Sequence, residues 1–235
     1  MKLNKHYSAA FALAVSSFSA QVISDTNAEI EEVLVSASLM PITASRSANA
    51  VTVIDRAQLR NRATVSLSNI LRDVPGFSVS QVGVLGSQTQ VRVRGAEANH
   101  LLVTIDGVEA NDPSQGDEFS WGTLTAFDIE RIEIIRGPQS SLRGSDAVAG
   151  VVNIITRTAE KSSVGLFLES GSWATHHSGF NIGHKQGDFD IRFGLSHIES
   201  AGDNIARTGD ENDGYRNTTY NIRSGLKLSD QMDIS

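Results

Sequence analysis

Carboxylate side chains gather in one polar stretch of the chain, residues 203–213. The stretch contains Asp203, Asp210, Glu211 and Asp213. Carboxylate oxygens are the ligands that hard cations prefer, but the glycine and the terminal glutamate of an EF-hand loop are not at their required spacing. A charged loop without a metal explains the same residues, so both interpretations stay open at this point.

Residues with catalytic potential show no catalytic arrangement. His176 and His177 are adjacent, so on a strand they point to opposite faces and cannot bind one ion together. The absence of cysteine excludes disulfides, thiolate metal sites and a cysteine nucleophile, and no GxSxG, GxGxxG, Walker or HExxH pattern occurs. A formal net charge of −7 disfavours generic nucleic-acid binding, which needs a basic surface. We therefore predict neither an enzyme nor a nucleic-acid-binding protein.

The N-terminus has the parts of a secretory signal peptide. Lys2 and Lys5 precede an apolar run over residues 9–15, and small residues up to Ala28 offer a cleavage site. A short amphipathic or core helix is the alternative. No other stretch approaches the roughly 18 apolar residues of a membrane-spanning helix. We expect residues 1–28 to be removed and the mature protein to be exported.

Residues 51–158 have the pattern of a compact α+β domain with a mixed sheet and short helices. Asp55 is placed to cap a helix that runs to Arg62. A second helix starts at Ser66, with apolar residues at helical spacing until Pro75-Gly76 ends it. Short strands are predicted at 51–54, 77–80, 90–94 and 101–105.

Residues 131–156 form the centre of that domain. Ile132 and Ile134 alternate with charged residues, as a half-buried strand requires. Arg136-Gly137-Pro138 then ends the strand, because proline removes a backbone donor and glycine permits unusual backbone angles. A second, more buried strand follows at residues 151–156. Nothing here has catalytic spacing, so we interpret the stretch as a rigid structural unit.

After Thr158 the chain changes to alternating segments of roughly ten residues each. Apolar residues recur at every second position around residues 164–168, 179–183, 190–195 and 219–228, and a further segment starts at 230. Antiparallel strands with this alternation are typical of a transmembrane β-barrel. A soluble meander is the alternative, but glycine at alternate positions weakens a self-contained soluble sheet.

Several motifs resemble those of the TonB-dependent outer-membrane receptors. EEVLVSA at residues 31–37 resembles the TonB box of that family, and IDGVEAND, VRVRG and RIEIIRGPQSSLRGSDAVAGVVNIIT resemble its plug signatures. Among the branches the cobalamin receptors look nearest, although receptors for catecholate siderophores share much of the last motif. The resemblance divides the chain into a signal peptide (1–28), a TonB box with linker (29–50), an α+β plug domain (51–158) and the first antiparallel strands of a transmembrane β-barrel (159–235).

The resemblance implies active uptake of a metal-chelate nutrient, cobalamin or an iron siderophore, across the outer membrane of a Gram-negative bacterium, with no cofactor required. TonB, with its inner-membrane energising complex, would pull on Glu31, Glu32, Val33, Leu34, Val35, Ser36 and Ala37. A β-prone segment on a flexible linker suits pairing with the edge of another protein's sheet. An ordinary first strand of the domain is the alternative.

The resemblance also indicates site residues. Ligand contacts are expected in two loops at the plug apex, at Val82, Gly83, Val84, Leu85, Gly86, Ser87, Gln88, Asn111, Phe119 and Trp121. Both aromatic rings could stack on a flat ligand or pack in the core. Five arginines are candidates for seating the plug against barrel carboxylates, with solvated strand faces as the alternative: Arg92, Arg94, Arg131, Arg136 and Arg143. Cobalamin receptors carry calcium in the corresponding barrel loop, so Asp203, Glu211 and Asp213 are candidate Ca²⁺ ligands.

The number of strands in the sequence is small for such a receptor. A barrel of about 22 strands needs roughly 400 residues, whereas about 75 follow Thr158. Four strands cannot close a barrel, and open edges leave unpaired backbone groups in lipid. We therefore expect an incomplete barrel and a fragment that does not transport by itself. The alternative from another class is a non-transporting periplasmic module that resembles a plug and acts in binding or signalling.

Overall fold

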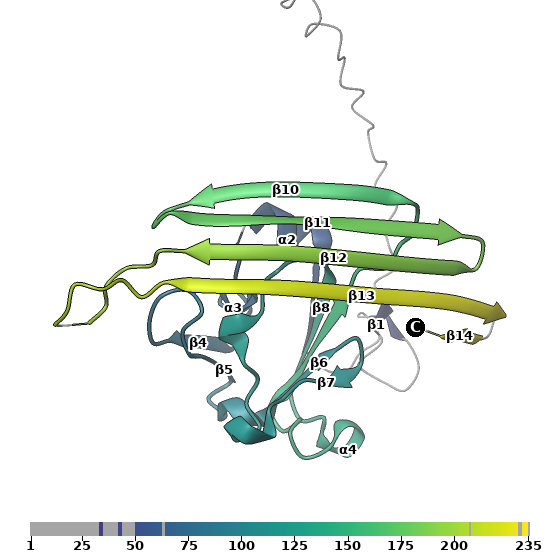
Figure 1. The fold of residues 1–235 in the computed structure, drawn as a ribbon. Coiled ribbons are helices and arrows are strands. Elements are labelled where there is room, and N and C mark those ends of the chain that lie inside the picture. The colour runs from purple at the N-terminus through teal and green to yellow at the C-terminus, as the bar shows by residue number, and fades with distance from the viewer. Residues whose placement is uncertain are drawn as a thin grey trace, which may run out of the picture. The chain divides into compact units, whose positions relative to one another are not determined.

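The computed structural model describes residues 33–34, 42–43, 50–62, 64–206, 208–229 and 232–234. All of them lie in one compact unit, Glu32–Ser235. Figure 1 shows two layers in this unit, a sheet of long strands and, below it in this view, a smaller mixed sheet with short helices. The predicted signal peptide, residues 1–28, lies outside the described residues.

The smaller sheet belongs to residues 50–161, called the plug region below. Its strand order is β3-β8-β9-β6-β7, with β6 and β9 parallel and the other neighbours antiparallel, so the sheet is mixed as predicted. Its strands are β3 (Ala50–Asp55), β6 (Leu101–Ile105), β7 (Val108–Glu109), β8 (Ile129–Arg136) and β9 (Gly150–Thr156). A separate antiparallel hairpin consists of β4 (Phe77–Gln81) and β5 (Thr89–Val93).

Short helices connect these strands, and the first begins as the sequence predicts. The helices are α2 (Arg56–Arg62), α3 (Leu67–Leu71) and α4 (Ser140–Arg143), with 3-10 turns η2 (Ala98–His100), η3 (Pro113–Gln115) and η4 (Trp121–Thr123). Asp55 Oδ1 accepts the Gln58 N–H at 2.8 Å, and Gln58 Oε1 accepts the Asp55 N–H at 3.3 Å. This reciprocal pair satisfies two donors at the start of α2.

The hydrophobic core confirms the central role of residues 131–156. Ile132 and Ile134 of β8 pack in it with Val152 and Ile154 of β9 and with the apolar face of α3. Strand β8 is buried on both faces rather than one, since Glu133 is also fully buried. That carboxylate accepts hydrogen bonds from Arg131 at 2.8 Å and from Asn153 at 3.2 Å, which compensates the loss of solvent.

The long strands form a second sheet, called the meander sheet below. Its strands are β10 (Ser163–Gly171), β11 (Thr175–Gln186), β12 (Phe189–Ser200), β13 (Tyr215–Ser229) and β14 (Met232–Ile234), each antiparallel to the next. The first four are longer than the predicted apolar segments because their polar ends stay paired, as Glu199 does with Arg216. In the part of the chain that the structure describes, no helix combines the length and the apolar character needed to cross a membrane.

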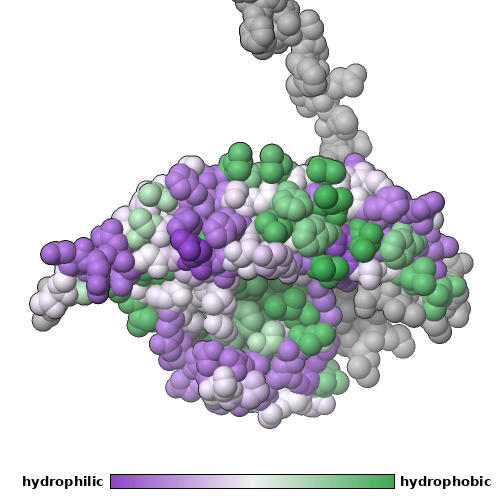
Figure 2. Space-filling view, in the orientation of Figure 1, coloured by the Kyte–Doolittle hydropathy of each residue, from purple (hydrophilic) through white to green (hydrophobic). Residues whose placement is uncertain are grey.

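The two faces of the meander sheet differ in polarity. The outer face carries two apolar rows across four strands, Val164–Ile182–Phe193–Ile222 and Leu166–Phe180–Leu195–Tyr220. Val164, Leu166 and Ile222 are each more than 70% exposed, at 79%, 74% and 75%, and Figure 2 shows apolar atoms over these strands. The inner face carries buried polar residues and glycines and packs against the plug region, as at Arg192 and Gly194.

Candidate functional site

The predicted TonB box, residues 31–37, is described only at Val33 and Leu34. These two residues form β1 (Val33–Leu34), which pairs antiparallel with β2 (Ile42–Thr43). Glu31, Glu32, Val35, Ser36 and Ala37 lie outside the described residues. Strand β2 falls within the stretch expected to be a linker, where two β-branched residues favour the extended conformation.

The first predicted ligand loop, residues 82–88, is the turn of the β4–β5 hairpin. Backbone hydrogen bonds close it, from the Val82 N–H to the Gln88 carbonyl at 3.2 Å and from the Ser87 N–H to the Val84 carbonyl at 3.1 Å. The Gln81 side chain donates to the same Val84 carbonyl at 2.7 Å. Val82 is 71% exposed, so the closed loop presents an apolar side chain to its surroundings.

The second predicted ligand loop, residues 111–121, is held mainly by its own polar groups. Asn111 Nδ2 donates to the Leu101 carbonyl at 3.1 Å and to the Asp117 carbonyl at 2.7 Å, and its Oδ1 accepts the Val103 N–H at 2.8 Å. Both amide hydrogens of Asn111 are therefore used inside the plug region, and the residue shapes the loop. Asp112 caps η3 by accepting from the Ser114 N–H and hydroxyl, at 2.9 and 2.7 Å.

The aromatic pair of this loop requires a correction. Trp121 is 3% exposed and belongs to the hydrophobic core, so its face is not available to a ligand. Phe119 packs against that core at its partly buried position and meets Trp121 edge to face, with 4.7 Å between ring centroids. Core packing, the alternative left open by the sequence, is what the structure shows for Trp121, because the ring fills the space beside the β5 strand.

A third segment joins these loops, and the sequence did not indicate it. Tyr215, at the start of β13, lies against Gly86, where an added Cβ would overlap the tyrosine ring. Ile205 lies beside Gly83, where an added Cβ would come within 2.9 Å of the isoleucine side chain. Loop 82–88, η4, Ile205 and Tyr215 form what we call the apical cluster. Only the folded structure shows these contacts, since loop 201–214 has no periodic pattern.

The predicted seating arginines make their observed contacts within the plug region. Arg92 donates to Gln90 at 2.8 Å, Arg131 to Glu133 at 2.8 Å, and Arg136 to the Pro75 carbonyl at 2.8 Å. Arg94 has a left-handed backbone, with φ of 52°, and its N–H donates to the Gly76 carbonyl at 2.8 Å. Arg143 ends α4.

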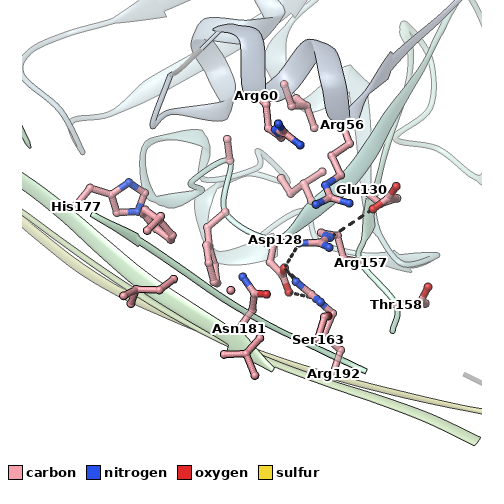
Figure 3. Close-up of a pocket in the computed structure, with 18 of the residues that line it drawn as sticks. Arg56, Arg60, Asp128, Glu130, Arg157, Thr158, Ser163, His177, Asn181 and Arg192 are labelled. Atoms are coloured by element: carbon pink, nitrogen blue, oxygen red, sulfur yellow. Dashed lines mark hydrogen bonds and ion pairs between the residues drawn. The ribbon is translucent and has the colours of Figure 1, made fainter. Parts of the chain in front are cut away.

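A buried ion pair connects the plug region to the meander sheet, but its charges are arranged in the reverse of the predicted way. Arg192 on β12 donates from Nε to both oxygens of Asp128, at 3.0 and 2.9 Å, and from Nη2 to Oδ1 at 2.5 Å, as Figure 3 shows. Asp128 is 8% exposed and Arg192 is 2% exposed. Here the carboxylate comes from the plug region and the guanidinium from the strands. We call this buried pair the seat.

Neighbouring residues make room for the seat. Asp128 has a left-handed backbone, with φ of 58°, which turns its side chain toward β12. Gly194 lies two residues from Arg192 on the same face, and a Cβ there would come within 3.0 Å of the Phe127 ring and 3.1 Å of Asp128 Oδ2. Phe127 also packs against Phe167 of β10, with 5.6 Å between ring centroids. The small Gly194 and the positively charged Arg192 on one face of β12 therefore accommodate Phe127 and Asp128 of the plug region.

A second polar contact lies at the β6–β7 turn. Asp106 accepts the Thr156 N–H at 2.9 Å and also bonds the Thr156 hydroxyl. Arg223 on β13 donates to Asp106 Oδ1 at 2.6 Å and to the Thr156 carbonyl at 2.9 Å. The side chains of Asp106 and Arg223 are 29% and 22% exposed, so this pair is more accessible than the seat.

The acidic loop does not have the arrangement of a metal site. Asp203 and Asp213 bind neighbouring backbone groups, at Asn204 N–H (2.9 Å) and Ile205 N–H (3.1 Å). Among the residues that the structure describes, no three histidine or acidic side chains gather to hold a metal ion, and Glu211 is among those described. This arrangement gives no support to Ca²⁺ binding by Asp203, Glu211 and Asp213, which stays a prediction from the sequence.

Comparison with known proteins identifies relatives of the plug region. Residues 43–151 match the model of the TonB-dependent receptor plug domain. The vitamin B12 transporter BtuB of Vibrio vulnificus is 38% identical over 131 residues, which cover 55% of this chain and 21% of the relative. The chain therefore spans about a fifth of the length of that curated relative.

Solved receptors share the fold beyond the plug region. The ferric yersiniabactin uptake receptor FyuA of Yersinia pestis is similar with a TM-score of 0.60 and 22% identity, over 80% of this chain and 30% of its own. The pyoverdine outer membrane receptor FpvA of Pseudomonas aeruginosa gives a TM-score of 0.71 and 16% identity, over 84% of this chain and 28% of its own. The plug match identifies residues 43–151 as a TonB-dependent receptor plug domain, and the motifs and the shared fold make the chain similar to the TonB-dependent receptors of the Gram-negative outer membrane.

Proposed function

We propose that this chain is the plug and the first barrel strands of a transporter that takes up a metal-chelate nutrient. Residues 29–50 supply the TonB box and linker after a signal peptide at 1–28, residues 51–158 the plug, and residues 159–235 the first transmembrane strands. TonB supplies the work, since the outer membrane has no energy source of its own.

The observation that carries the proposal is the two-faced meander sheet with the plug region on its polar face. Its outer rows expose large apolar side chains, among them Leu166 at 74% and Ile222 at 75%. Such a surface is unfavourable in water and favourable in lipid. Its inner face holds Asp128 of the plug region through Arg192, out of contact with solvent. A soluble periplasmic module would have no use for the apolar outer face.

Cobalamin is the substrate we propose first, and an iron siderophore second. The relative that transports vitamin B12 is 38% identical over 131 residues, whereas FyuA and FpvA are 22% and 16% identical over longer stretches, 80% and 84% of this chain. The apical cluster is the surface proposed for the ligand, with exposed Val82 and Ile205 as apolar contacts, at 71% and 58% exposure. Phe119 is the remaining aromatic candidate beside them.

The experiment compares binding and uptake in the intact receptor. Leu34→Pro removes a backbone donor from the proposed TonB box and disfavours strand pairing, whereas Leu34→Val preserves both. We expect Leu34→Pro cells to bind labelled cobalamin normally and to lose uptake, and Leu34→Val cells to retain both. Uptake that persists in the proline variant would contradict the assignment of the TonB box. Energised uptake of a ferric siderophore with no cobalamin binding would make the second substrate the correct one.

A further inference from the structure

A pocket of about 740 Å³ lies on the flank of the plug region, away from the apical cluster. Its walls come from α2, from segments 126–130 and 157–161, and from the inner face of β10–β12. None of its lining residues belongs to the apical loops or to the predicted TonB box. The proposed uptake of a chelate therefore leaves this pocket without a role.

Three guanidinium groups lie together at one end of the pocket, and a fourth arginine lines the pocket from α2. Figure 3 shows Arg56 reaching down from α2 and Arg192 reaching up from the meander sheet, with Arg157 between them, while Arg60 stays closer to the helix. Two carboxylates, Asp128 and Glu130, lie in the same group. Lys161, Glu160 and Glu169 also line the pocket, so an excess of positive charge remains over the whole lining.

The donors of these arginines are not all satisfied. Arg192 uses its donors on Asp128, but Arg157 lies 3.6 Å from both Asp128 and Glu130, too far for hydrogen bonds. Arg157 Nε is buried and has no hydrogen-bond partner. Among the residues that the structure describes, none forms a hydrogen bond or an ion pair with the side chain of Arg56 or Arg60. A buried N–H without an acceptor is unfavourable, which indicates that the site accommodates one.

The electrostatics of Arg157 point the same way. Burial lowers its pKa, and the like charges of Arg192 and Arg56 lower it further, with Asp128 and Glu130 opposing them. An additional negative group beside Arg157 would relieve this repulsion. Guanidinium forks match the oxygens of phosphate and carboxylate groups in a planar, two-point geometry.

Apolar side chains also line the pocket. Leu59 and Val65 line it from the plug region, as do Phe127 and Ile129, and Phe167 lines it from β10. The volume is within the usual range of sites for small organic molecules and far exceeds that of a single oxyanion. We propose that this pocket binds a small organic anion, with a phosphate or carboxylate group on Arg157, Arg56 and Arg60 and an apolar body against Phe127 and Phe167.

Calorimetric titration of the purified protein in detergent micelles tests the proposal, with phenyl phosphate, benzoate and the neutral analogue benzyl alcohol as probes. We expect saturable binding of at least one of the two anions and none of the alcohol; the stronger anion identifies the preferred group. Arg157→Gln and Arg56→Gln should each weaken binding about tenfold or more, through loss of a charge-assisted hydrogen bond.

Arg216→Gln is the matched control, because Arg216 is 70% exposed on the strands and its loss removes the same charge elsewhere. Binding should be unchanged in this variant. If Arg157→Gln fails to fold, Arg56→Gln and Arg60→Gln decide the question, since both residues lie on the accessible side of a surface helix. Absence of saturable anion binding, equal binding of the alcohol, or full affinity in the α2 variants would each overturn the proposal. Cobalamin uptake does not enter these readouts, so the two proposals can fail separately.

Discussion

From the geometry of the seat we can predict how much the Asp128–Arg192 pair contributes to the free energy of unfolding of the plug region. Replacement of Arg192 by methionine keeps an unbranched apolar stem but removes the charged guanidinium, leaving Asp128 buried at 8% exposure. Removing one partner of a buried ion pair typically costs about 3–5 kcal/mol, because the other charge loses both its partner and its solvent. Arg157 remains 3.6 Å from Asp128 and compensates in part. We therefore expect the low end of that range, about 3 kcal/mol.

Tryptophan fluorescence during urea unfolding in detergent micelles measures this cost. The chain has two tryptophans. Trp121 is in the core of the plug region, whereas Trp173 is 62% exposed in the β10–β11 turn. In a Trp173→Phe background the signal reports the plug region alone. The variants Arg192→Met, Asp128→Asn and their double combination form a cycle that separates the pair energy from the cost of each single change.

Arg216→Met supplies the control for this measurement. It breaks the pair with Glu199, whose side chains are 70% and 52% exposed, and solvent-exposed pairs contribute little. We expect no measurable change in the unfolding of the plug region. If Arg192→Met were as mild as Arg216→Met, or if the cycle showed no coupling between Asp128 and Arg192, the seat would not hold the plug region and the reasoning would be wrong.

Two further predictions concern glycine spacing and acid sensitivity. Gly194→Ala places a Cβ within 3.0 Å of Phe127 and should destabilise the plug region by about 1–3 kcal/mol in the same unfolding assay. The control is Gly171→Ala on β10, where the nearest neighbour of the added Cβ would be 3.7 Å away, and this variant should be tolerated. Hydrogen bonds from Ser114 and Gln115 lower the pKa of Asp112 below its usual 3.8. These bonds therefore stabilise loop 112–118 fully above pH 3.8, and the stabilisation is lost as the pH falls through the lower pKa of the folded state. The protection of amides in this loop, measured as the exchange rate relative to the intrinsic rate at the same pH, should therefore change little down to pH 4 and fall only below it, and an earlier loss of protection would refute the assignment.

Local rules were sufficient for most of the plug region. The capping pair at Asp55, the helical spacing of Leu67, Ile70 and Leu71, and the break after Arg136 each depend on residues a few positions apart. The alternation after Thr158 likewise gave the antiparallel strands. Such signals are complete in the sequence, so the longer strands, α2 and α3 could be predicted with errors at their ends, whereas the short elements β2, β7 and α4 were not predicted.

The seat could not be predicted in this way, because its partners are 64 residues apart in the chain. We predicted that arginines of the plug motifs seat the plug. Those with described side-chain contacts instead bind groups of their own region. One signal was present: Arg192 occupies the polar parity of an otherwise apolar strand, DIRFGL, where a charge needs a partner. The sequence could not identify Asp128 as that partner, because only the folded chain shows the left-handed backbone at Asp128 and its carboxylate beside β12. Ile205 and Tyr215 were missed for the same reason, since Ile205 lies within a long loop without periodicity and Tyr215 directly follows it.

Under the proposed function, the parity of β12 gives one strand a face toward the membrane and a face toward the plug region. Arg192 and Gly194 lie on the inner face, while Ile191, Phe193 and Leu195 alternate with them on the outer face. A shift of the pairing register by one residue would exchange the two sets, turning the arginine toward lipid and a phenylalanine toward Asp128. Both exchanges are unfavourable, since lipid excludes the charge and the buried carboxylate would lose its partner. Docking of the plug region and exposure of the apolar rows therefore favour the same register of β12, so that the Asp128–Arg192 pair also helps to align the strands around it.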